Sequence, residues 1–273
     1  MRPPATRASL DPRRNPPLRR RPATATATIP TLVFALACAS GCTQAARRGA
    51  PSAAQAAPGA VAAPGTPGAP VIVPNLWDTQ AAIDAWIKSG RWETEVASVT
   101  AQTGAWMEER AKAVAKPAIV LDVDETALSN WPALRANRWA RIADGPCDLE
   151  HGPCGLREWQ KSGKAQAIRP VLALARRARE LGVAVFFVVT RPPELMEATR
   201  RNLREQGYEF TEVIGPPKGV KYPSSADFKA GTRRDLVNKG WTIVAVVGDQ
   251  ETDLTGGSGE RFYKLPNPVY RIR

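Results

Sequence analysis

The sequence predicts an α/β fold in which helices flank a parallel sheet and a small cap is inserted after the first strand. Apolar runs at 119–121, within 183–193 and within 242–254 support this prediction. Uninterrupted β-branched and aliphatic runs are typical of parallel strands that are covered on both faces. Helical periodicity surrounds these runs, at about 78–89, 92–114, 170–182 and 194–206.

The first apolar run ends in two carboxylates, in the stretch IVLDVDETALSN that begins at Ile119. Residues i and i+2 of a strand point to the same side, so Asp122 and Asp124 are expected to face one ligand. Ligands of open α/β sheets bind outside the carboxyl ends of the strands, which is where this pair emerges. Two neighbouring anions require a cation or a shared proton. The following residues, Glu125 and Thr126, fit a local hydrogen-bonded turn as well as they fit a catalytic role.

The later apolar runs also end in polar residues. The second, VAVFFVVTRPP, ends at Thr190, and the third, TIVAVVGDQETDL, ends at Asp249 with Asp253 four positions further on. Lys229 lies between them, near the start of a predicted helix. Taken singly, Thr190 would only end a strand, Asp249 would begin a turn, and Lys229 would be a solvated cation. Taken together, they predict one crevice that holds carboxylates, a hydroxyl donor and a cation.

The chain resembles phosphatases of the haloacid dehalogenase (HAD) superfamily, in the branch with bacterial class C acid phosphatases and plant acid phosphatases related to vegetative storage proteins. The matching stretches are LDVDETALSN, VVTRPP, FKAGTRRDLVNKG, VVGDQETDL and KLPNPVY, within roughly residues 75–273. The resemblance implies a HAD-type, Rossmann-like sheet and a hydrolase that acts on small phosphomonoesters, with nucleoside monophosphates among the candidates. GDQETDL resembles the plant-like branch more than the nucleotide-hydrolysing class C enzymes.

The resemblance assigns chemical roles to the two aspartates. Asp122 is the expected nucleophile, since a carboxylate splits one difficult displacement into two easier ones through an aspartyl-phosphate. Asp124 is the expected general acid and base, and it acts first as an acid. We therefore expect a pKa for Asp124 above its ordinary value, raised by an anionic neighbour.

The remaining motif residues are expected to hold the phosphoryl group and a metal ion. Phosphate binding is assigned to Thr190, Arg191 and Lys229, with Lys218 and Lys221 as weaker alternatives to Lys229. Mg²⁺ is the expected cofactor because it prefers oxygen ligands. Its predicted ligands are Asp122, Asp249, the backbone carbonyl of Asp124, and Asp253 through a water molecule.

The chain lacks the residues that other phosphatase mechanisms require. His151 is the single histidine, so phosphohistidine enzymes and multi-histidine metal sites are excluded. His151 is expected to be an exposed loop residue, with zinc binding as a minor alternative. Cys42 and Arg48 match Cys-x5-Arg but follow no strand, and no P-loop motif occurs. A phosphotransferase or a catalytically weak storage relative remain alternatives, and a dehalogenase has no need of Asp124.

Composition and charge predict an exported protein with three parts. Residues 1–44 hold seven arginines and one aspartate, so much of the net charge of +12 lies there, and residues 75–273 keep about +4. This mild basicity suits a small anionic substrate and gives no reason to expect a nucleic acid polymer as partner. Residues 1–42 are interpreted as a signal peptide or lipoprotein leader, 43–74 as an Ala/Pro/Gly-rich flexible linker, and 75–273 as the phosphatase domain.

The leader predicts attachment to a bacterial cell envelope. Residues 29–41 form an apolar stretch that is too short to span a bilayer, and Ala39 to Cys42 resemble a lipobox. Lipidated Cys42 would anchor the protein, most naturally in the outer membrane, and plain cleavage with periplasmic release is the alternative. The oligomeric state is not indicated by the sequence.

The segment 127–166 is expected to form the cap. It contains Cys147 and Cys154, which are expected to form a disulfide in an oxidising compartment. It also contains three tryptophans, of which two are expected to pack the cap onto the core. The third, Trp131, is the candidate for stacking on an aromatic leaving group because it lies seven residues after Asp124. Val269 and Tyr270, near the end of the chain, are expected to pack rather than act.

Overall fold

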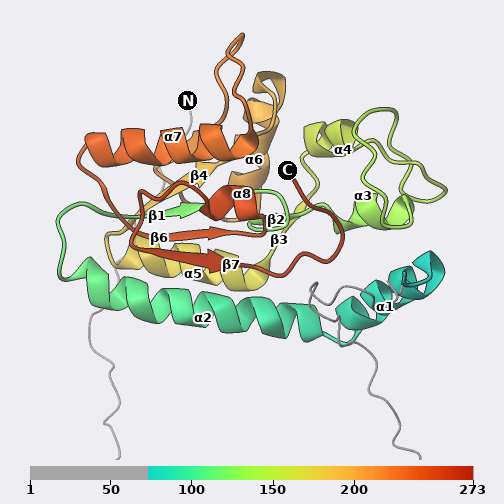
Figure 1. Ribbon diagram of the computed structural model, residues 1–273, viewed down its shortest axis with the longest axis horizontal. Coiled ribbons are helices and arrows are strands. Elements are labelled where there is room, and N and C mark those ends of the chain that lie inside the picture. Colours follow the sequence, from blue (N-terminus) through green and yellow to red (C-terminus); the bar gives the residue numbers. More distant parts are fainter. Residues whose placement is uncertain (1–72, 273) are drawn as a thin grey trace, which may run out of the picture. The chain divides into compact units, whose positions relative to one another are not determined.

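The computed structural model describes residues 73–272 and contains a five-stranded parallel sheet (Figure 1). Its strands are β1 (Pro117–Leu121), β4 (Ala184–Val188), β5 (Glu212–Ile214), β6 (Thr242–Gly248) and β7 (Arg261–Lys264). The strand order is β5-β4-β1-β6-β7, and every neighbouring pair runs parallel. The α/β fold class is therefore confirmed, and β1, β4 and β6 lie in the three predicted apolar runs.

Outside the cap, the helices of residues 73–272 are α1 (Leu76–Lys88), α2 (Arg91–Ala111), α5 (Arg169–Glu180), α6 (Met196–Glu205), α7 (Ser225–Asn238) and the short α8 (Glu251–Leu254). Four of them, α1, α2, α5 and α6, begin and end close to the positions predicted from periodicity. A single 3₁₀ turn, Pro193–Leu195, precedes α6. Ser224 caps the start of α7, and its hydroxyl accepts a hydrogen bond from the backbone N–H of Asp227 (3.1 Å). The first turns of this helix carry Lys229 toward the sheet.

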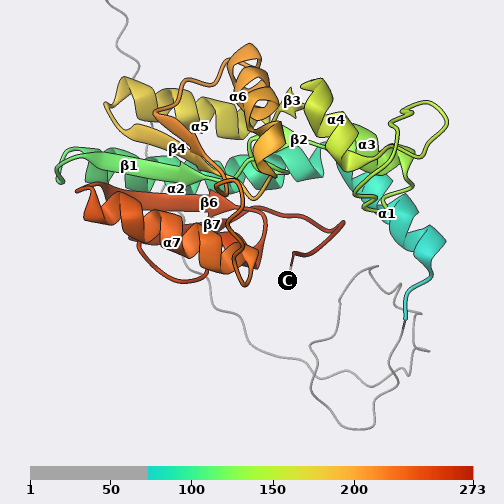
Figure 2. The ribbon, with the colours of Figure 1, turned by 90° about the horizontal axis from the view of Figure 1, so that it is seen from above.

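The alternating side chains of β1 divide the core between the two faces of the sheet. Ile119 and Leu121 pack into a cluster shared with α2 and α5, whereas Ala118 and Val120 pack into a second cluster with α7. Figure 2 shows α5 on one side of the sheet and α7 on the other. Both faces of β1 are therefore buried, which explains its uninterrupted apolar sequence.

The strand order places a topological switch point between β1 and β6. The chain runs from β1 outward to β4 and β5, and then returns to the other side of β1 to form β6 and β7. Asp122 directly follows β1, and Asp249 directly follows β6. The two carboxylates therefore end the strands on either side of the crevice in which open α/β sheets bind their ligands.

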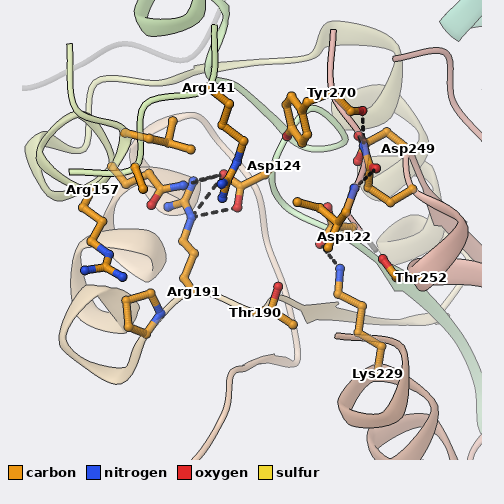
Figure 3. Close-up of a pocket in the computed structure, with 16 residues that line it drawn as sticks. Asp122, Asp124, Arg141, Arg157, Thr190, Arg191, Lys229, Asp249, Thr252 and Tyr270 are labelled. Atoms are coloured by element: carbon orange, nitrogen blue, oxygen red, sulfur yellow. Dashed lines mark hydrogen bonds and ion pairs between the residues drawn. The ribbon is translucent and has the colours of Figure 1, made fainter. Parts of the chain in front are cut away.

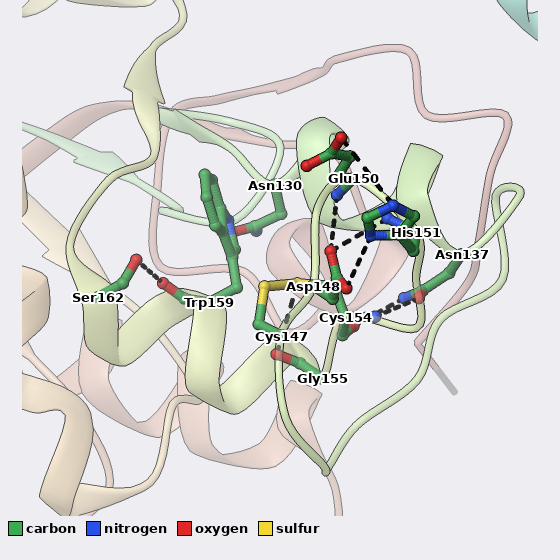
Figure 4. Close-up of a disulfide and its surroundings, with 10 residues drawn as sticks. All are labelled: Asn130, Asn137, Cys147, Asp148, Glu150, His151, Cys154, Gly155, Trp159 and Ser162. Carbon is green, nitrogen blue, oxygen red and sulfur yellow. Dashed lines mark hydrogen bonds and ion pairs between the residues drawn. A yellow bond between two sulfur atoms is a disulfide. The ribbon is translucent and has the colours of Figure 1, made fainter.

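The predicted cap is built from two short strands and two short helices. Strands β2 (Leu128–Ser129) and β3 (Gln166–Ala167) pair antiparallel, and between them lie α3 (Trp131–Ala136) and α4 (Leu156–Ser162). Cys147 and Cys154 form the predicted disulfide in the loop between the two helices (Figure 4). Asn137 holds this loop, donating to the Cys154 carbonyl (2.8 Å) and accepting from the Cys154 N–H (2.7 Å). His151 is exposed on the same loop, as predicted, beside Asp148.

The stacking role expected of Trp131 is wrong. Trp131 is 6% exposed, and its ring lies 4.2 Å from Trp92 of α2 and 5.9 Å from Trp139, centroid to centroid. It is buried there because α1 and α2 offer an aromatic surface against which the cap packs. Trp139 and Trp159 are also buried, so all three cap tryptophans serve packing.

The predicted leader, the lipidation site Cys42 and nearly all of the predicted linker lie outside the described residues. Within residues 73–272, no helix combines the length and the apolarity needed to cross a membrane.

Candidate active site

A pocket of about 240 Å³ lies between the cap and the carboxyl ends of the central strands (Figure 3). Its volume is below the range of about 300–1,000 Å³ that is usual for drug-sized ligands, which favours a small ligand. The pocket contains the predicted residues Asp122, Asp124, Thr190, Arg191, Lys229 and Asp249. The residues contributed by the cap and by the C-terminal segment are Arg141, Ala143, Leu156, Arg157, Gln160, Tyr270 and Ile272.

Lys229 joins two carboxylates at the base of the pocket. Its Nζ donates to Asp122 Oδ1 (2.6 Å) and to Asp253 Oδ1 (2.5 Å), and all three side chains are at least 90% buried. The Asp253 side chain can lie against the end of β6 because that strand ends in a glycine, Gly248. A Cβ built on Gly248 would lie 2.2 Å from Asp253 Oδ2, so a larger residue would displace this carboxylate.

Burial and charge act in opposite directions on this group. Burial raises the pKa of Asp122 well above its ordinary value, although the Lys229 ammonium opposes the shift. Burial lowers the pKa of Lys229, but the Asp122 and Asp253 carboxylates outweigh burial and raise it. Lys229 is therefore a permanent cation beside Asp122. The alternatives Lys218 and Lys221 are exposed in the loop before α7, away from the residues that line the pocket.

Three carboxylates form a candidate metal site. Asp122, Asp249 and Asp253 each offer an oxygen, and these three atoms lie within 4.8 Å of one another. An all-oxygen, buried donor set fits a hard divalent cation. Burial raises the pKa of Asp249 to about 7, and the Asp253 and Glu125 charges add to the shift, so a cation here would relieve a real electrostatic cost. Among residues 73–272, this is the one cluster of three or more such ligands.

Asp249 is oriented by donors that the sequence analysis did not identify. Asn267 Nδ2 donates to Asp249 Oδ2 (2.7 Å), Thr126 Oγ1 donates to Asp249 Oδ1 (3.2 Å), and Gln250 Nε2 also contacts Oδ2. Thr126 thus has a specific partner in the site rather than only a turn role. Asn267 comes from the KLPNPVY stretch, and the resemblance of that stretch to the family is the feature of the sequence that could have indicated its role.

The pKa expected for Asp124 is wrong in direction. Burial raises this pKa, but the ion pair with Arg191 and hydrogen bonds from Arg191 and Asn130 outweigh burial, so the pKa is lowered. Arg191 Nη2 lies 2.7 Å from Asp124 Oδ1, and Asn130 Nδ2 lies 2.6 Å from the same oxygen. The charge that most affects the pKa of Asp124 is thus that of Arg191, a cation that follows β4, and not the neighbouring anion that the sequence suggested.

Arg191 itself is held inside the protein. It is 3% exposed, and its Nη1 donates to Thr199 Oγ1 (2.9 Å) on α6. Its guanidinium is engaged by Asp124 and Thr199, so the structure places it beside the proton-transfer candidate, although it still lines the pocket. Thr190, the residue before it, is exposed at the pocket wall between Arg191 and Lys229 (Figure 3).

Buried Glu125 and half-buried Tyr270 form a hydrogen-bonded pair next to Asp124. Glu125 is 2% exposed, and its carboxylate accepts from the Asn130 N–H (2.7 Å) and from the Tyr270 hydroxyl. Burial raises the pKa of Glu125 to about 7, and the charge of Asp124 adds to it. The expectation that Tyr270 only packs is therefore incomplete, because Tyr270 also lines the pocket and bonds the residue next to Asp124.

Comparison with known proteins agrees with this arrangement. A model of the family described as HAD superfamily, subfamily IIIB (acid phosphatase), matches residues 71–273. The chain belongs to this family. Among curated proteins, the stem 28 kDa glycoprotein of Glycine max is similar to it, being 31% identical over 163 residues, 58% of this chain and 61% of the relative. Acid phosphatase 1 of Solanum lycopersicum is 32% identical over 156 residues, 56% of this chain and 58% of the relative.

The matched regions span between half and two thirds of the curated relatives. Among solved structures, the class C acid phosphatase from Bacillus anthracis is similar in fold, with a TM-score of 0.57 and 23% identity over 72% of this chain and 86% of that chain. The HAD-type, Rossmann-like architecture predicted from the motifs is confirmed.

Proposed function

We propose that this protein is an exported, Mg²⁺-dependent acid phosphatase that hydrolyses small phosphomonoesters through an aspartyl-phosphate on Asp122. The observation that carries the proposal is the contact of Lys229 Nζ with Asp122 Oδ1 (2.6 Å) in a pocket at the switch point of the sheet. A nucleophilic carboxylate next to a permanent cation can approach an anionic phosphoryl group. Membership of subfamily IIIB supports the same reaction.

In the first half-reaction, an Asp122 carboxylate oxygen forms a bond to phosphorus as the bond from phosphorus to the leaving-group oxygen breaks. Asp124 gives its proton to that oxygen, and Lys229 and Thr190 neutralise and hold the phosphoryl oxygens. In the second half-reaction, water attacks phosphorus and passes a proton to Asp124, and the bond between phosphorus and Asp122 breaks. The net reaction consumes one water and releases an alcohol and phosphate.

The ion pair between Arg191 and Asp124 supports the acid character of this phosphatase. A lowered pKa keeps Asp124 ionised, and so free to accept a proton in the second half-reaction, unless the solution is acidic. Low pH thus supplies the proton that the first half-reaction needs.

Mg²⁺ would be held by Asp122, Asp249 and the backbone carbonyl of Asp124, with Asp253 acting through a water molecule; it would screen the negative charges that meet when substrate binds. The oxygen-only donor set of the three aspartates supports this assignment. Asp253 also has a second task, because it fixes Lys229 through one oxygen and accepts the Gln250 N–H (2.8 Å) through the other.

Export to the cell envelope rests on the leader and on the disulfide. The apolar stretch at 29–41 and the lipobox-like sequence ending at Cys42 support a lipid anchor, and plain cleavage with periplasmic release is the alternative. The Cys147–Cys154 disulfide supports an oxidising compartment. Fractionating cells that produce the full chain or a Cys42→Ser variant separates the two routes, because only a lipidated protein stays with the membranes and is released by the substitution.

The reaction is tested with a panel of nucleotides, sugar phosphates and aryl phosphates, assayed with added Mg²⁺ and with EDTA. Hydrolysis that needs the metal, and that is lost in Asp122→Asn, is the expected result. Rapid quenching during turnover should trap label from the phosphoryl group on Asp122. Activity that survives chelation contradicts the metal assignment, and activity that survives Asp122→Asn contradicts the nucleophile.

A further inference from the structure

Two arginines of the cap line the pocket on the side where the leaving group must lie. Arg141 follows α3, and Arg157 is the second residue of α4. Figure 3 shows Arg141 pointing from the cap toward Asp124, while Arg157 lies beyond Arg191. Because Asp124 is the group that protonates the leaving oxygen in the proposed reaction, the Arg141 guanidinium lies near the leaving group rather than near the attacked phosphorus. Arg157 lines the pocket further out, on the far side of Arg191.

The other two cations of the pocket already have buried partners. Arg191 is paired with Asp124 at 2.7 Å, and Lys229 with Asp122 at 2.6 Å and Asp253 at 2.5 Å. These pairs are at least three-quarters buried, so both cations belong to the catalytic machinery. They do not explain why the cap adds two more positive charges.

The cap arginines, in contrast, are open to a ligand. Among residues 73–272, no carboxylate lies within 4.0 Å of Arg141, whose guanidinium carbon rests 5.7 Å from the centre of the Tyr270 ring. Arg157 pairs with Asp144 at 2.9 Å, but both side chains are more than half exposed (58% and 65%). Such a surface pair is weak in water and readily exchanged for an anion that binds inside the pocket.

The cap residues that line this pocket include no aromatic side chain. None of the three cap tryptophans lines the pocket, and the remaining cap residues there are Ala143, Leu156 and Gln160. The single aromatic residue that lines it, Tyr270, has Arg141 over its ring. The groups that the cap offers to a leaving group are therefore mainly two guanidiniums, whose positive charge favours an anionic substituent.

We propose that Arg141 and Arg157 bind a second oxyanion, a carboxylate or a phosphate, on the leaving group, so that the preferred substrates are small phosphomonoesters with two anionic groups. This rests on the proposed phosphatase function and adds its substrate class. A guanidinium presents a planar set of N–H donors that matches either oxyanion. Binding at the cap would also draw the leaving oxygen toward Asp124.

The test compares substrates that differ in one charge. Glycerol 3-phosphate and 3-phosphoglycerate differ at a carboxylate, and fructose 6-phosphate and fructose 1,6-bisphosphate differ at a second phosphate. The quantity measured is the ratio of kcat/KM for the charged member to kcat/KM for its partner, at constant ionic strength so that long-range steering stays equal. Running both pairs shows which oxyanion the cap prefers.

The expected ratio in the unaltered protein is about tenfold or more, which corresponds to about 1.4 kcal/mol. Arg141→Gln should lower the ratio for the preferred pair about tenfold, Arg157→Gln should lower it in the same direction, and Arg141→Lys should restore part of it. Arg138→Gln is the matched control. It removes the same charge from the same loop, but Arg138 stacks on Trp77 (5.0 Å) and is absent from the pocket lining.

Three results would overturn the inference. A ratio near one with both substrate pairs contradicts it while leaving the phosphatase function standing. An equal loss of ratio in Arg138→Gln shows that only the overall charge of the cap matters. Failure to hydrolyse any of the four substrates while nucleotides or aryl phosphates are hydrolysed contradicts the inference alone, and failure with the whole panel in the presence of Mg²⁺ contradicts the proposed function as well.

Discussion

Arg191, which follows the neighbouring strand, binds Asp124 through hydrogen bonds, with Nη2 at 2.7 Å from Oδ1 and Nε at 3.2 Å from Oδ2. The two residues are separated by 67 positions, yet β1 and β4 are adjacent and parallel, so their following residues meet. Arg191 was expected to bind phosphate, and it is instead the strongest influence that opposes burial and lowers the pKa of Asp124, the expected proton-transfer residue.

Replacing Arg191 with glutamine should change both the rate and its pH dependence. The Arg191 charge and hydrogen bond lower the pKa of Asp124, so their loss raises that pKa, and Asp124 keeps its proton to higher pH. The alkaline limb of the kcat/KM profile should therefore move to higher pH. At the optimum, kcat/KM should fall about 10–100-fold, because a hydrogen bond to a charged group contributes about 1.5–3 kcal/mol. Measuring kcat/KM from pH 4 to 8 checks this.

Arg191→Lys is the comparison variant because it keeps the charge. Its pH profile should stay closer to that of the unaltered protein, although the bidentate contact is lost. An unchanged limb in Arg191→Gln would show that Asp124 is not the group that sets it.

Asn267 is expected to control the affinity for Mg²⁺. Its Nδ2 donates to Asp249 Oδ2 (2.7 Å) and so fixes the carboxylate that the proposed metal would use. Loss of such an orienting partner typically costs about 10–100-fold in metal affinity. Asn267→Ala should therefore need about 10–100-fold more Mg²⁺ for half-maximal activity. Bound metal also raises the melting temperature, and half of that rise should likewise need about 10–100-fold more Mg²⁺. Asn238→Ala, an exposed asparagine at the end of α7, should leave both curves unchanged.

The strand-end residues could be predicted because their signal is local. Asp122, Thr190 and Asp249 each follow an apolar run, and parallel strands bring their carboxyl ends to one edge of the sheet. Hydrophobic periodicity therefore located the crevice. It also located α1, α2, α5 and α6 to within a few residues, since their apolar stripes are continuous in sequence.

The partners of these residues could not be predicted in the same way. Tyr270 bonds Glu125 across 145 positions, and Asn267 reaches Asp249 from an irregular segment whose path no periodicity describes. Trp131 was misplaced for a related reason. Its sequence distance from Asp124 is short, but the burial of a large ring against Trp92 decides its direction.

The Cys147–Cys154 bond should stabilise the cap. Peptide mapping of unreduced protein should recover the two cysteines linked, and the double serine variant should lose about 2–3 kcal/mol of unfolding free energy, as expected for a short closed loop. The loop ends directly before α4, so Arg157 should also become less well positioned. Two free thiols in unreduced, exported protein would contradict the prediction.

Lys229→Met should cost both activity and stability, and the stability loss should depend on pH. Removing one partner of a buried ion pair typically costs about 3–5 kcal/mol, because the remaining charges stay buried without compensation. Here Asp122 and Asp253 would remain, and the pKa of Asp122, already raised by burial, would rise further. A raised folded-state pKa means that the folded protein binds more protons than the unfolded chain, so stability falls as pH rises.

Urea unfolding in EDTA between pH 5 and 8 measures this directly. The gap between Lys229→Met and the unaltered protein should widen toward pH 8 and narrow toward pH 5, where protonated carboxyl groups no longer need the ammonium. Lys221→Met removes an exposed lysine and should behave like the unaltered protein throughout. kcat of Lys229→Met should fall about 10²–10³-fold, the usual cost of losing one group that stabilises transition-state charge. A gap that stays constant across this pH range would mean that Lys229 contributes packing rather than charge.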